Sequence, residues 1–344
     1  MPENTTARRA IHVVAGVLID GDRVCVTRRH DDTHQGGKWE FPGGKLESAE
    51  APFAGLQREL HEELGIDVQQ AAPFMCVRHD YGEIEVTLDV WQITRYRGTP
   101  QGREAQALRW IPITDLDPDE FPDADRPVLR RLQLPALYLL SDVGRFGRLE
   151  FTRRLTRALE AGARLVQLRE SQMDRIDFVA YARELATLCH RFGARLLINA
   201  DPGWVSDCGA DGVHLNSRRL LTLLQRPLAP QYWVGASCHN EHELQAAQRI
   251  GVDFAVLGSV QPTASHPTGT TLGWERFGEL CASTTLPVYA IGGVRPADSA
   301  VAKAVGAQGV AMIRGVWDRD DVEAVVRGLV RIPWSTSERQ VGRV

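Results

Sequence analysis

Three glutamates stand close together in residues 41–66, which read FPGGKLESAEAPFAGLQRELHEELGI. Glu59, Glu62 and Glu63 are spaced i, i+3 and i+4, so a helix would place their carboxylates on one stripe. Like charges at this spacing destabilise an isolated helix by about 0.2–0.5 kcal/mol per pair. A hard divalent cation takes oxygen ligands and would relieve that repulsion. The stripe is therefore a candidate metal site, and a solvated acidic helix face is the alternative interpretation.

An apolar stripe runs beside the carboxylates. From about residue 51 to residue 64, large apolar side chains recur at helical spacing, at Phe53, Leu56, Leu60 and Leu64. This pattern predicts an amphipathic helix. Its apolar stripe would pack against a sheet and leave the carboxylate stripe free to face a ligand.

The wider spacing of residues 44–66 fills every specified position of the pattern G-x5-E-x7-R-E-U-x-E-E-x-G-U, where U is apolar. The filled positions are Gly44, Glu50, Arg58, Glu59, Leu60, Glu62, Glu63, Gly65 and Ile66. The pattern is the Nudix box, and the region of about residues 11–134 resembles a Nudix hydrolase. The resemblance implies an enzyme that hydrolyses nucleoside diphosphates linked to another group.

The resemblance also implies a role for each polar residue of the box. The three glutamates would be metal ligands and catalytic residues, and the Gly43 carbonyl would add another ligand. Arg58 would pair with Glu50 or a neighbouring carboxylate and order the loop. Bound Mg²⁺, or Mn²⁺ in its place, would neutralise the diphosphate and lower the pKa of a bound water, whose proton a nearby carboxylate accepts. Which glutamate is the general base stays open.

Segments outside the box resemble the MutT-type enzymes, which clear oxidised guanine nucleotides such as 8-oxo-dGTP. This resemblance implies that Arg29, Gly44 and Lys45 bind substrate, with Arg29 near the phosphates or the base. It also makes Glu104, in the segment GREAQ, a further candidate metal ligand or general base. The alternative interpretations are a solvated strand end for Arg29 and a plain loop carboxylate for Glu104.

One position departs from the MutT-type pattern. Asp125, in the segment DEFPDADRPVLRRL, stands where that family reads the purine edge with an asparagine amide. An ionised aspartate only accepts hydrogen bonds, whereas burial that raises its pKa would let it both donate and accept. The expected reaction is Mg²⁺-dependent conversion of 8-oxo-dGTP to 8-oxo-dGMP and pyrophosphate. Such a reaction would sanitise the nucleotide pool and so serve DNA replication and repair.

The elements that must position these residues fall into two regions. In residues 1–134, strand-like runs such as IHVVAGVLI, RVCVTRR and EIEVTLDVWQITRY surround the helix. They predict a Nudix α/β/α sandwich with a mixed sheet. Residues 135–333 alternate eight strand candidates with amphipathic segments, which predicts a (β/α)8 barrel and leaves a doubly wound open sheet as the alternative. Residues 334–344 are interpreted as a frayed tail.

The second region, over about residues 137–332, resembles thiamine phosphate synthase and its TenI-type relatives. The segments LVQLRES, ADGVHLNS and YAIGGV carry the resemblance in the right order. Four positions depart from the family: Ser171 and His266 replace lysines, while Ala200 and Arg219 replace metal-binding aspartates. A Mg²⁺–pyrophosphate site that loses both carboxylates cannot keep its role unchanged. Altered or lost synthase activity is therefore expected.

Other barrel positions keep residues suited to a ligand. The candidate ligand-binding residues are Gln167, Arg169, Asn199, Ser237, His239, Thr263, Gly292 and Gly293. The two glycines and the later Arg314–Gly315 turn stand where barrels often cradle phosphate through backbone N–H groups, with tight-turn geometry as the alternative. His239 matches a position used by TenI-type tautomerases, and a structural or solvated histidine is its alternative.

Three hypotheses account for the two regions together. In the leading one, the Nudix region is an active nucleotide hydrolase and the barrel is a degenerate or altered thiamine-family domain. In the second, the Nudix region of a thiamine-pathway enzyme hydrolyses a thiamine diphosphate analogue or by-product. In the third, the barrel is a sensing or scaffold domain that binds a phosphorylated small molecule.

The overall composition limits the binding partners that are expected. The chain has 344 residues and a formal net charge of −4, so no general polyanion-binding surface and no direct DNA binding are expected. Its six cysteines form no CxxC pair, which is typical of reduced thiols in a cytoplasmic protein. The polar first ten residues read as no secretory signal, no run is long and apolar enough for a membrane span, and nothing indicates an oligomeric state.

Overall fold

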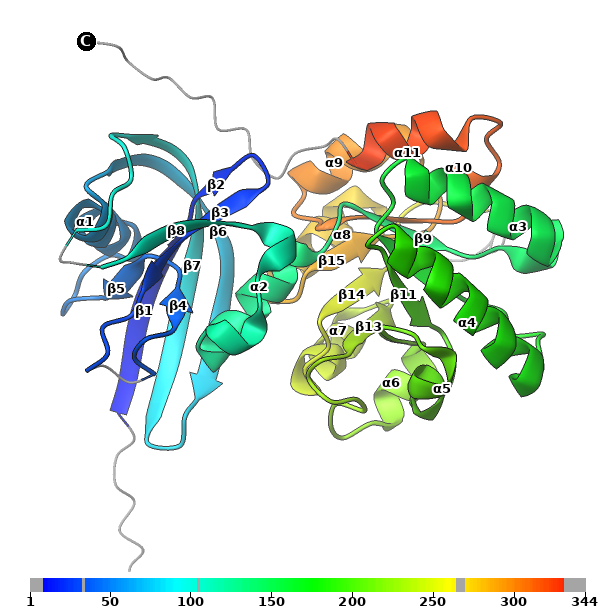
Figure 1. The fold of residues 1–344 in the computed structure, drawn as a ribbon, viewed down its shortest axis with the longest axis horizontal. Helices are drawn as coiled ribbons and strands as arrows, with labels where there is room; N and C mark the ends of the chain where they lie inside the picture. The colour runs from blue at the N-terminus through cyan, green and yellow to red at the C-terminus, as the bar shows by residue number, and fades with distance from the viewer. Residues whose placement is uncertain (1–8, 33–34, 104–105, 264–269, 331–344) are drawn as a thin grey trace, which may run out of the picture. The chain divides into compact units, whose positions relative to one another are not determined.

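The computed structural model describes residues 9–32, 35–103, 106–263 and 270–330. The chain forms two compact units, of which the first ends at Gln133 and the second begins at Leu134. Figure 1 shows the course of the chain through each unit. Each unit has its own hydrophobic clusters, so the fold of each follows from its own sequence.

The first unit is built on two sheets. One has the strand order β5-β1-β7-β6, and in the other β3 pairs with β2, β4 and β8. Its strands are β1 (Arg9–Val17), β2 (Ile19–Asp20), β3 (Arg23–Arg28), β4 (Trp39–Glu40), β5 (Gly43–Lys45), β6 (Asp67–Asp80), β7 (Ile84–Arg97) and β8 (Leu108–Pro112). Since β1 runs parallel to β7 but antiparallel to β5, the sheet is mixed, as the sequence predicts.

The strand β6 is a finding that the sequence pattern did not reveal. Its register with β7 shifts between Val68 and Gln70 and again between Pro73 and Met75. Each irregularity reverses the side-chain alternation on which strand recognition depends. Pro73 also lacks the backbone N–H that a regular ladder uses.

Helix α1 (Pro52–Leu64) lies on one face of the sheet and covers nearly the span predicted for it. A proline opens the helix, and Gly65 ends it in the left-handed conformation at φ 69°. The predicted apolar stripe is inside, because Leu56, Leu60 and Leu64 have no exposed surface. Together with β1, this stripe holds the carboxylates in place.

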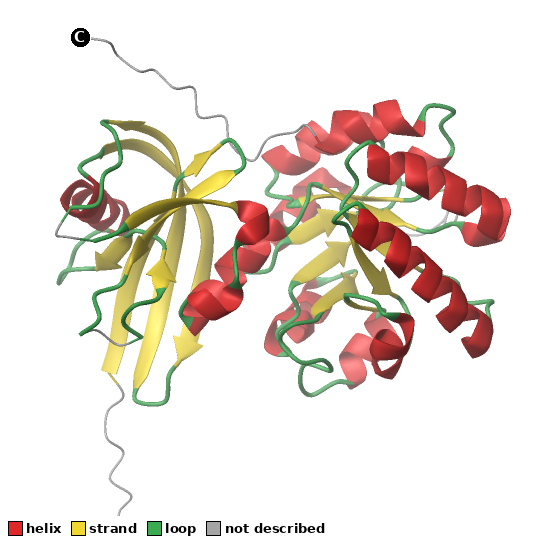
Figure 2. Ribbon diagram, in the orientation of Figure 1, coloured by secondary structure: helices red, strands yellow, loops and turns green. Residues whose placement is uncertain are grey.

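The opposite face of the sheet is covered by helix α2 (Arg126–Gln133), which follows the short turns η1 (Ile113–Asp115), η2 (Pro118–Glu120) and η3 (Asp123–Asp125). Strand β1 alternates between the two layers. Val14 packs in the cluster of Leu60, whereas Ala15 packs in the cluster of Val128 from α2. A helix on each face gives the predicted α/β/α arrangement, seen in Figure 2.

The second unit is a closed parallel barrel of eight strands, which confirms the predicted barrel. Its strands are β9 (Leu137–Leu140), β10 (Leu165–Leu168), β11 (Arg195–Ile198), β12 (Gly212–Leu215), β13 (Trp233–Cys238), β14 (Phe254–Leu257), β15 (Val288–Ala290) and β16 (Gly309–Met312). The open-sheet alternative is wrong, because the last strand pairs with the first through Val310 and Leu137.

Helices follow most of the barrel strands. They are α3 (Val143–Glu160), α4 (Arg175–Arg191), α5 (Val205–Cys208), α6 (Ser217–Thr222), α7 (Glu241–Arg249), α8 (Gly273–Ala282), α9 (Ser299–Ala304), α10 (Arg314–Trp317) and α11 (Val322–Val330), with the turns η4 (Pro202–Trp204) and η5 (Pro296–Asp298). Inside the barrel, the rings of Tyr138, Phe254 and Tyr289 pack against one another edge to face or tilted. Their centroids lie 5.3 to 5.8 Å apart. Within the described part of the chain, the helices are too short or too polar to cross a membrane.

Leu60 gives a test of how α1 is anchored. Leu60→Ala should lower the free energy of unfolding of the first unit by about 2–5 kcal/mol, because it leaves a cavity between α1 and the sheet. Urea unfolding of the full chain measures the change. Leu149→Ala is the control, since Leu149 is 88% exposed. Equal effects of the two substitutions would contradict the packing described for α1.

Candidate active site

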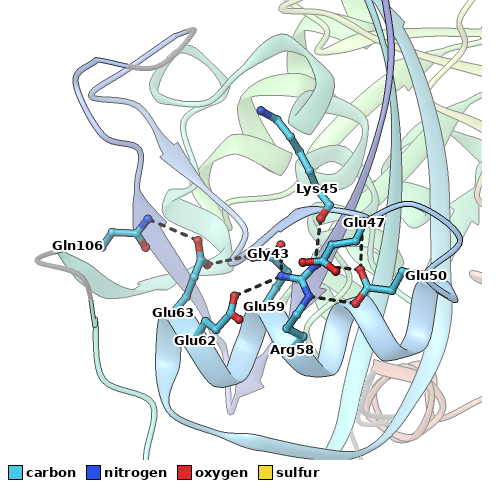
Figure 3. Close-up of polar contacts among 9 residues, drawn as sticks. All are labelled: Gly43, Lys45, Glu47, Glu50, Arg58, Glu59, Glu62, Glu63 and Gln106. Atoms are coloured by element: carbon cyan, nitrogen blue, oxygen red, sulfur yellow. Dashed lines mark hydrogen bonds and ion pairs between the residues drawn. The ribbon is translucent and has the colours of Figure 1, made fainter.

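Arg58 of α1 lies at the centre of a carboxylate cluster (Figure 3). Its guanidinium donates to both oxygens of Glu50 at 3.0 and 2.9 Å, and to Glu59 at 2.9 Å. It also donates to Glu62 at 3.2 Å and to the backbone carbonyl of Lys45 at 3.1 Å. The pairing with Glu50 expected from the sequence is therefore present. One side chain ties the loop after β5 to the middle of the helix.

Glu63 is held differently from the other two glutamates. It is 8% exposed, and one carboxylate oxygen accepts the Gly43 N–H at 2.9 Å. Burial raises the pKa of Glu63 to about 8; the Gly43 N–H opposes this shift, and the charges of Glu40 and Glu59 add to it. Burial also raises the pKa of Glu59, against the pull of Arg58. Two desolvated carboxyl groups that repel each other favour a cation between them.

The residues fit a hard divalent cation by their chemistry, since all three glutamates offer oxygen on one side of α1. They do not yet form a closed cage, because no group of three or more acidic, histidine or cysteine side chains among the described residues converges as a metal site. Arg58 pairs with an oxygen of both Glu59 and Glu62. A cation would take over part of that pairing. The remaining predicted ligand, Glu104, lies outside the described residues.

The two box positions predicted to bind substrate next to Gly43 have clear local roles. A Cβ on Gly44 would lie 2.4 Å from the carboxyl carbon of Glu59, so only glycine lets that side chain approach the loop. Lys45 accepts from Arg58 through its carbonyl, and its side chain points away from the glutamates (Figure 3). Gly44 thus makes room for the cluster, while substrate contact by either residue stays a prediction.

A second group of charged residues lies around Asp125. This side chain is 6% exposed, and burial raises its pKa to about 8, helped by the charge of Glu40 and opposed by that of Arg29. Arg29 donates to Glu40, whose own pKa burial also raises. The Tyr81 hydroxyl accepts the Ala124 N–H at 3.1 Å beside them. At neutral pH the Asp125 carboxyl therefore keeps its proton and can both donate and accept.

Glu40 is a residue that the sequence reasoning missed. It stands on β4, directly before the segment FPGGK, and its charge raises the pKa of both Glu63 and Asp125. The available signal was a single carboxylate in a short, mostly apolar run, next to a box that already supplied several glutamates. The fold makes Glu40 the link between the two acidic groups of this unit.

The barrel carries a cavity of about 740 Å³ at the carboxyl ends of its strands. The residues predicted to bind a ligand all line it, namely Gln167, Arg169, Asn199, Ser237, His239, Thr263, Gly292 and Gly293. Gly292 and Gly293 have φ of 89° and 70°, and a Cβ on either would meet neighbouring atoms at 2.6 Å. Tight-turn geometry therefore accounts for both glycines, whether or not they also cradle phosphate.

A buried hydrogen-bonded chain crosses the floor of this cavity. Gln167 donates to the Tyr138 hydroxyl at 2.9 Å, which lies 3.3 Å from Nδ1 of His214. Nε2 of His214 lies 2.9 Å from the Ser237 hydroxyl. Burial lowers the pKa of His214 to about 3, so its ring is neutral. If the Tyr138 hydroxyl donates to Nδ1, Nε2–H donates to Ser237, and the Ser237 hydrogen is left for a ligand.

His239 stands at the same cavity with an acidic partner. Its Nδ1 lies 2.8 Å from a Glu243 oxygen, which also accepts the His239 backbone N–H at 2.7 Å. A carboxylate on one ring nitrogen orients the imidazole and directs the other nitrogen elsewhere. This arrangement is suited to proton transfer at the cavity, although it equally orders the start of α7.

Comparisons with known proteins agree with both units. A family model described as a NUDIX domain matches residues 14–131, and one described as thiamine monophosphate synthase matches residues 137–316. The 8-oxo-dGTP diphosphatase of Escherichia coli (strain K12) is 34% identical over 126 residues, which are 36% of this chain and 98% of that protein. The thiamine-phosphate synthase of Thioalkalivibrio sulfidiphilus is 35% identical over 173 residues, 50% of this chain and 82% of that protein.

Among solved structures, a thiamine phosphate pyrophosphorylase from Pyrococcus furiosus is similar to the barrel. It is 25% identical, with a TM-score of 0.48, and the match covers 56% of this chain and 92% of that one.

Arg58 gives a test of the cluster as a structural unit. Arg58→Gln should lower the free energy of unfolding of the first unit by about 1–3 kcal/mol at neutral pH, because it leaves two largely buried carboxylates, Glu50 and Glu59, without a counter-charge. Urea unfolding measures the loss. The control is Arg153→Gln, which breaks an exposed ion pair with Glu150 and should cost less than about 1 kcal/mol. A control loss as large as that of Arg58→Gln would rule out a central role for Arg58.

Proposed function

The chain belongs to the Nudix family through its first unit and to the thiamine monophosphate synthase family through its second, and on this basis we propose that the first unit hydrolyses 8-oxo-dGTP. The products would be 8-oxo-dGMP and pyrophosphate. Nudix membership itself implies a hydrolase acting on pyrophosphate bonds. The observation that carries the substrate is the burial of Asp125 in the same unit as the carboxylate cluster, which raises the pKa of its carboxyl and favours the protonated form.

The cluster on α1 supports the hydrolytic half of this proposal. Glu59, Glu62, Glu63 and the Gly43 carbonyl would hold a divalent cation, which when bound neutralises diphosphate charge and lowers the pKa of a water. Arg58 keeps the loop after β5 against the helix, so the loop and the carboxylates of α1 stay together. A glutamate that is not bonded to Arg58 is the better proton acceptor. Glu63 meets this condition, since its oxygens accept from Gly43 and Gln106 instead, and a bound cation would lower its raised pKa so that the carboxylate could accept a proton.

The group around Asp125 supports the proposed choice of nucleobase. A protonated carboxyl offers one donor and one acceptor, which reproduces the pattern of an asparagine amide. Nearby, the Phe41 and Phe121 rings lie 6.0 Å apart, and Lys38 donates to the Phe121 carbonyl at 3.1 Å. Both rings are buried in the hydrophobic core with Ala124, so the proposed contact with a flat heterocycle falls to Asp125. The MutT-like relative is described as an 8-oxo-dGTP diphosphatase, which favours an oxidised guanine as that heterocycle.

For the barrel, the proposal is altered or lost synthase activity. The support is that neither position at which the family carries a metal-binding aspartate holds an acid, since residues 200 and 219 are alanine and arginine. The cavity nevertheless keeps polar groups able to bind a phosphorylated small molecule. The full chain is expected to form no thiamine phosphate from the usual synthase precursors.

Glu63 tests the catalytic cluster. Glu63→Gln should lower kcat for 8-oxo-dGTP by about 10²–10⁴-fold, because it removes a proton acceptor and a ligand charge while keeping the shape of the side chain. Pyrophosphate release in the presence of Mg²⁺ measures it. Glu83→Gln, on an exposed turn of the same unit, is the matched control and should leave kcat unchanged. Full activity in both Glu62→Gln and Glu63→Gln would show the carboxylate assignment to be wrong.

The pH dependence of KM tests whether Asp125 reads the nucleobase. The raised pKa of Asp125 keeps the proton on the carboxyl up to pH of about 8. Above that pH the donor is lost and a charge appears, so KM for 8-oxo-dGTP should rise about tenfold between pH 7 and 9. Asp125→Asn should remove this rise, because an amide donates at every pH, whereas Asp119→Asn at an 85% exposed side chain should retain it.

Two results would reject the assignment of Asp125. One is an identical pH profile for the unaltered protein and Asp125→Asn. The other is turnover of dGTP, dATP or sugar nucleotides that matches turnover of 8-oxo-dGTP, since the site would then not read the oxidised base.

A further inference from the structure

The barrel cavity has a wall that is unusually poor in acids. Four arginines line it, Arg169, Arg295, Arg314 and Arg319, and the one carboxylate among the described lining residues is Asp318. That carboxylate accepts from Arg145 and so has its own counter-charge. A cavity of this sign attracts anions and repels free cations.

The resemblance to thiamine phosphate synthase implies Mg²⁺ at residues 200 and 219, and the residues present do not fit it. Ala200 follows β11 and has no ligand atom in its side chain, while Arg219 on α6 brings a positive charge. The nearest acid in sequence, Asp201, accepts the Gly203 N–H at 2.9 Å and is engaged in its own turn. Mg²⁺ needs several oxygen ligands and commonly one or two carboxylates. Cation-assisted binding is therefore not supported at this rim.

Arg219 instead spans the two former metal positions. Its Nη1 donates to the Ala200 carbonyl at 2.6 Å, which fixes the guanidinium at the ends of β11 and β12. Within the described residues that is the one hydrogen bond of this guanidinium, so further N–H groups of its fork stay available. Neighbouring residues Asn199 and Asn216 line the cavity. A fixed cationic fork thus adjoins the place where a bound metal would have presented its charge.

Arg169 directly follows β10, the strand that pairs with β11. Leu168 pairs with Ile198 in the register of β10 and β11, so Arg169 and Asn199 are neighbours on the rim. In the described structure the guanidinium of Arg169 makes no hydrogen bond or ion pair, although it lines the cavity and its charge reaches His214. Two guanidinium groups on adjacent strand ends can bind phosphate oxygens in the bidentate geometry that arginine favours.

We infer that the barrel binds a phosphoanion, of the pyrophosphate or phosphate-ester class, without a divalent cation, and that Arg219 replaces the cation. Arg219 lies next to the cavity lining, since its backbone N–H donates to Asn216, and the Ser237 hydroxyl of that lining adds a neutral donor when Tyr138 donates to His214. The inference rests on the proposal that synthase chemistry is altered. The two claims can be tested separately. Anion binding is measured directly, whereas synthase chemistry is measured by product formation.

Calorimetric titration of the full chain with inorganic pyrophosphate tests the inference. All variants carry Glu63→Gln, so that the first unit contributes little to the measured binding of pyrophosphate. With EDTA present, one pyrophosphate should bind per chain, and adding Mg²⁺ should not tighten binding. Arg219→Gln should weaken binding at least tenfold, because a charged hydrogen bond and a counter-charge are both lost. Arg276→Gln is the charge-matched control, because Arg276 lies on α8 in an exposed ion pair with Glu279. This variant should bind pyrophosphate as the parent chain does.

Introducing acids at residues 200 and 219 tests whether Arg219 stands in for a divalent cation. Ala200→Asp combined with Arg219→Asp should abolish binding in EDTA and make it depend on Mg²⁺. Binding by the parent chain only when Mg²⁺ is present would overturn the inference, and this comparison needs no altered residue at the rim. Unchanged affinity in a folded Arg219→Gln chain would overturn the role of Arg219.

Discussion

The carboxylate cluster of the first unit depends on one guanidinium. Arg58 pairs with Glu50, Glu59 and Glu62 at distances of 2.9 to 3.2 Å, and so joins residues from a loop and a helix that would otherwise repel one another. Arginine suits this task because its planar fork offers five donors and cannot lose its charge. Much of the repulsion foreseen for the stripe is balanced inside the protein, which leaves Glu63 as the glutamate with least compensation.

Burial gives the remaining acids their character. Glu63 and Asp125 both have pKa values raised to about 8, because water is excluded from each and Glu40 adds its charge to both. The consequences differ with location. Beside Arg58 and Gly43, a desolvated carboxyl favours binding of a cation, while among rings and away from the cluster a retained proton gives hydrogen-bonding versatility. In the proposed function, this one physical effect would prepare one group for hydrolysis and the other for reading a nucleobase.

The barrel has the fold of its family, and its cavity is lined by more basic than acidic side chains. Gln167, Asn199 and Ser237 retain their places around the cavity, and His214 stays neutral beneath them. At the rim, Arg219 donates to the carbonyl of Ala200, and these are the two positions at which the family resemblance implies metal-binding acids. Strand pairing fixes this scaffold, whereas the chemistry of the cavity depends on a few side chains at its rim.

The sequence by itself determined the helix of the carboxylates and the alternation that builds the barrel, because these follow from local spacing and hydrophobic period. The residues around the cavity were indicated by the resemblance to the thiamine phosphate synthase family. Tertiary structure alone decided the rest. Strand β6 escaped prediction because its bulges break the alternation, and Glu40 because its neighbours are distant in sequence. The protonation of Asp125 was conditional on burial, and burial is a property of packing that no local pattern of residues records.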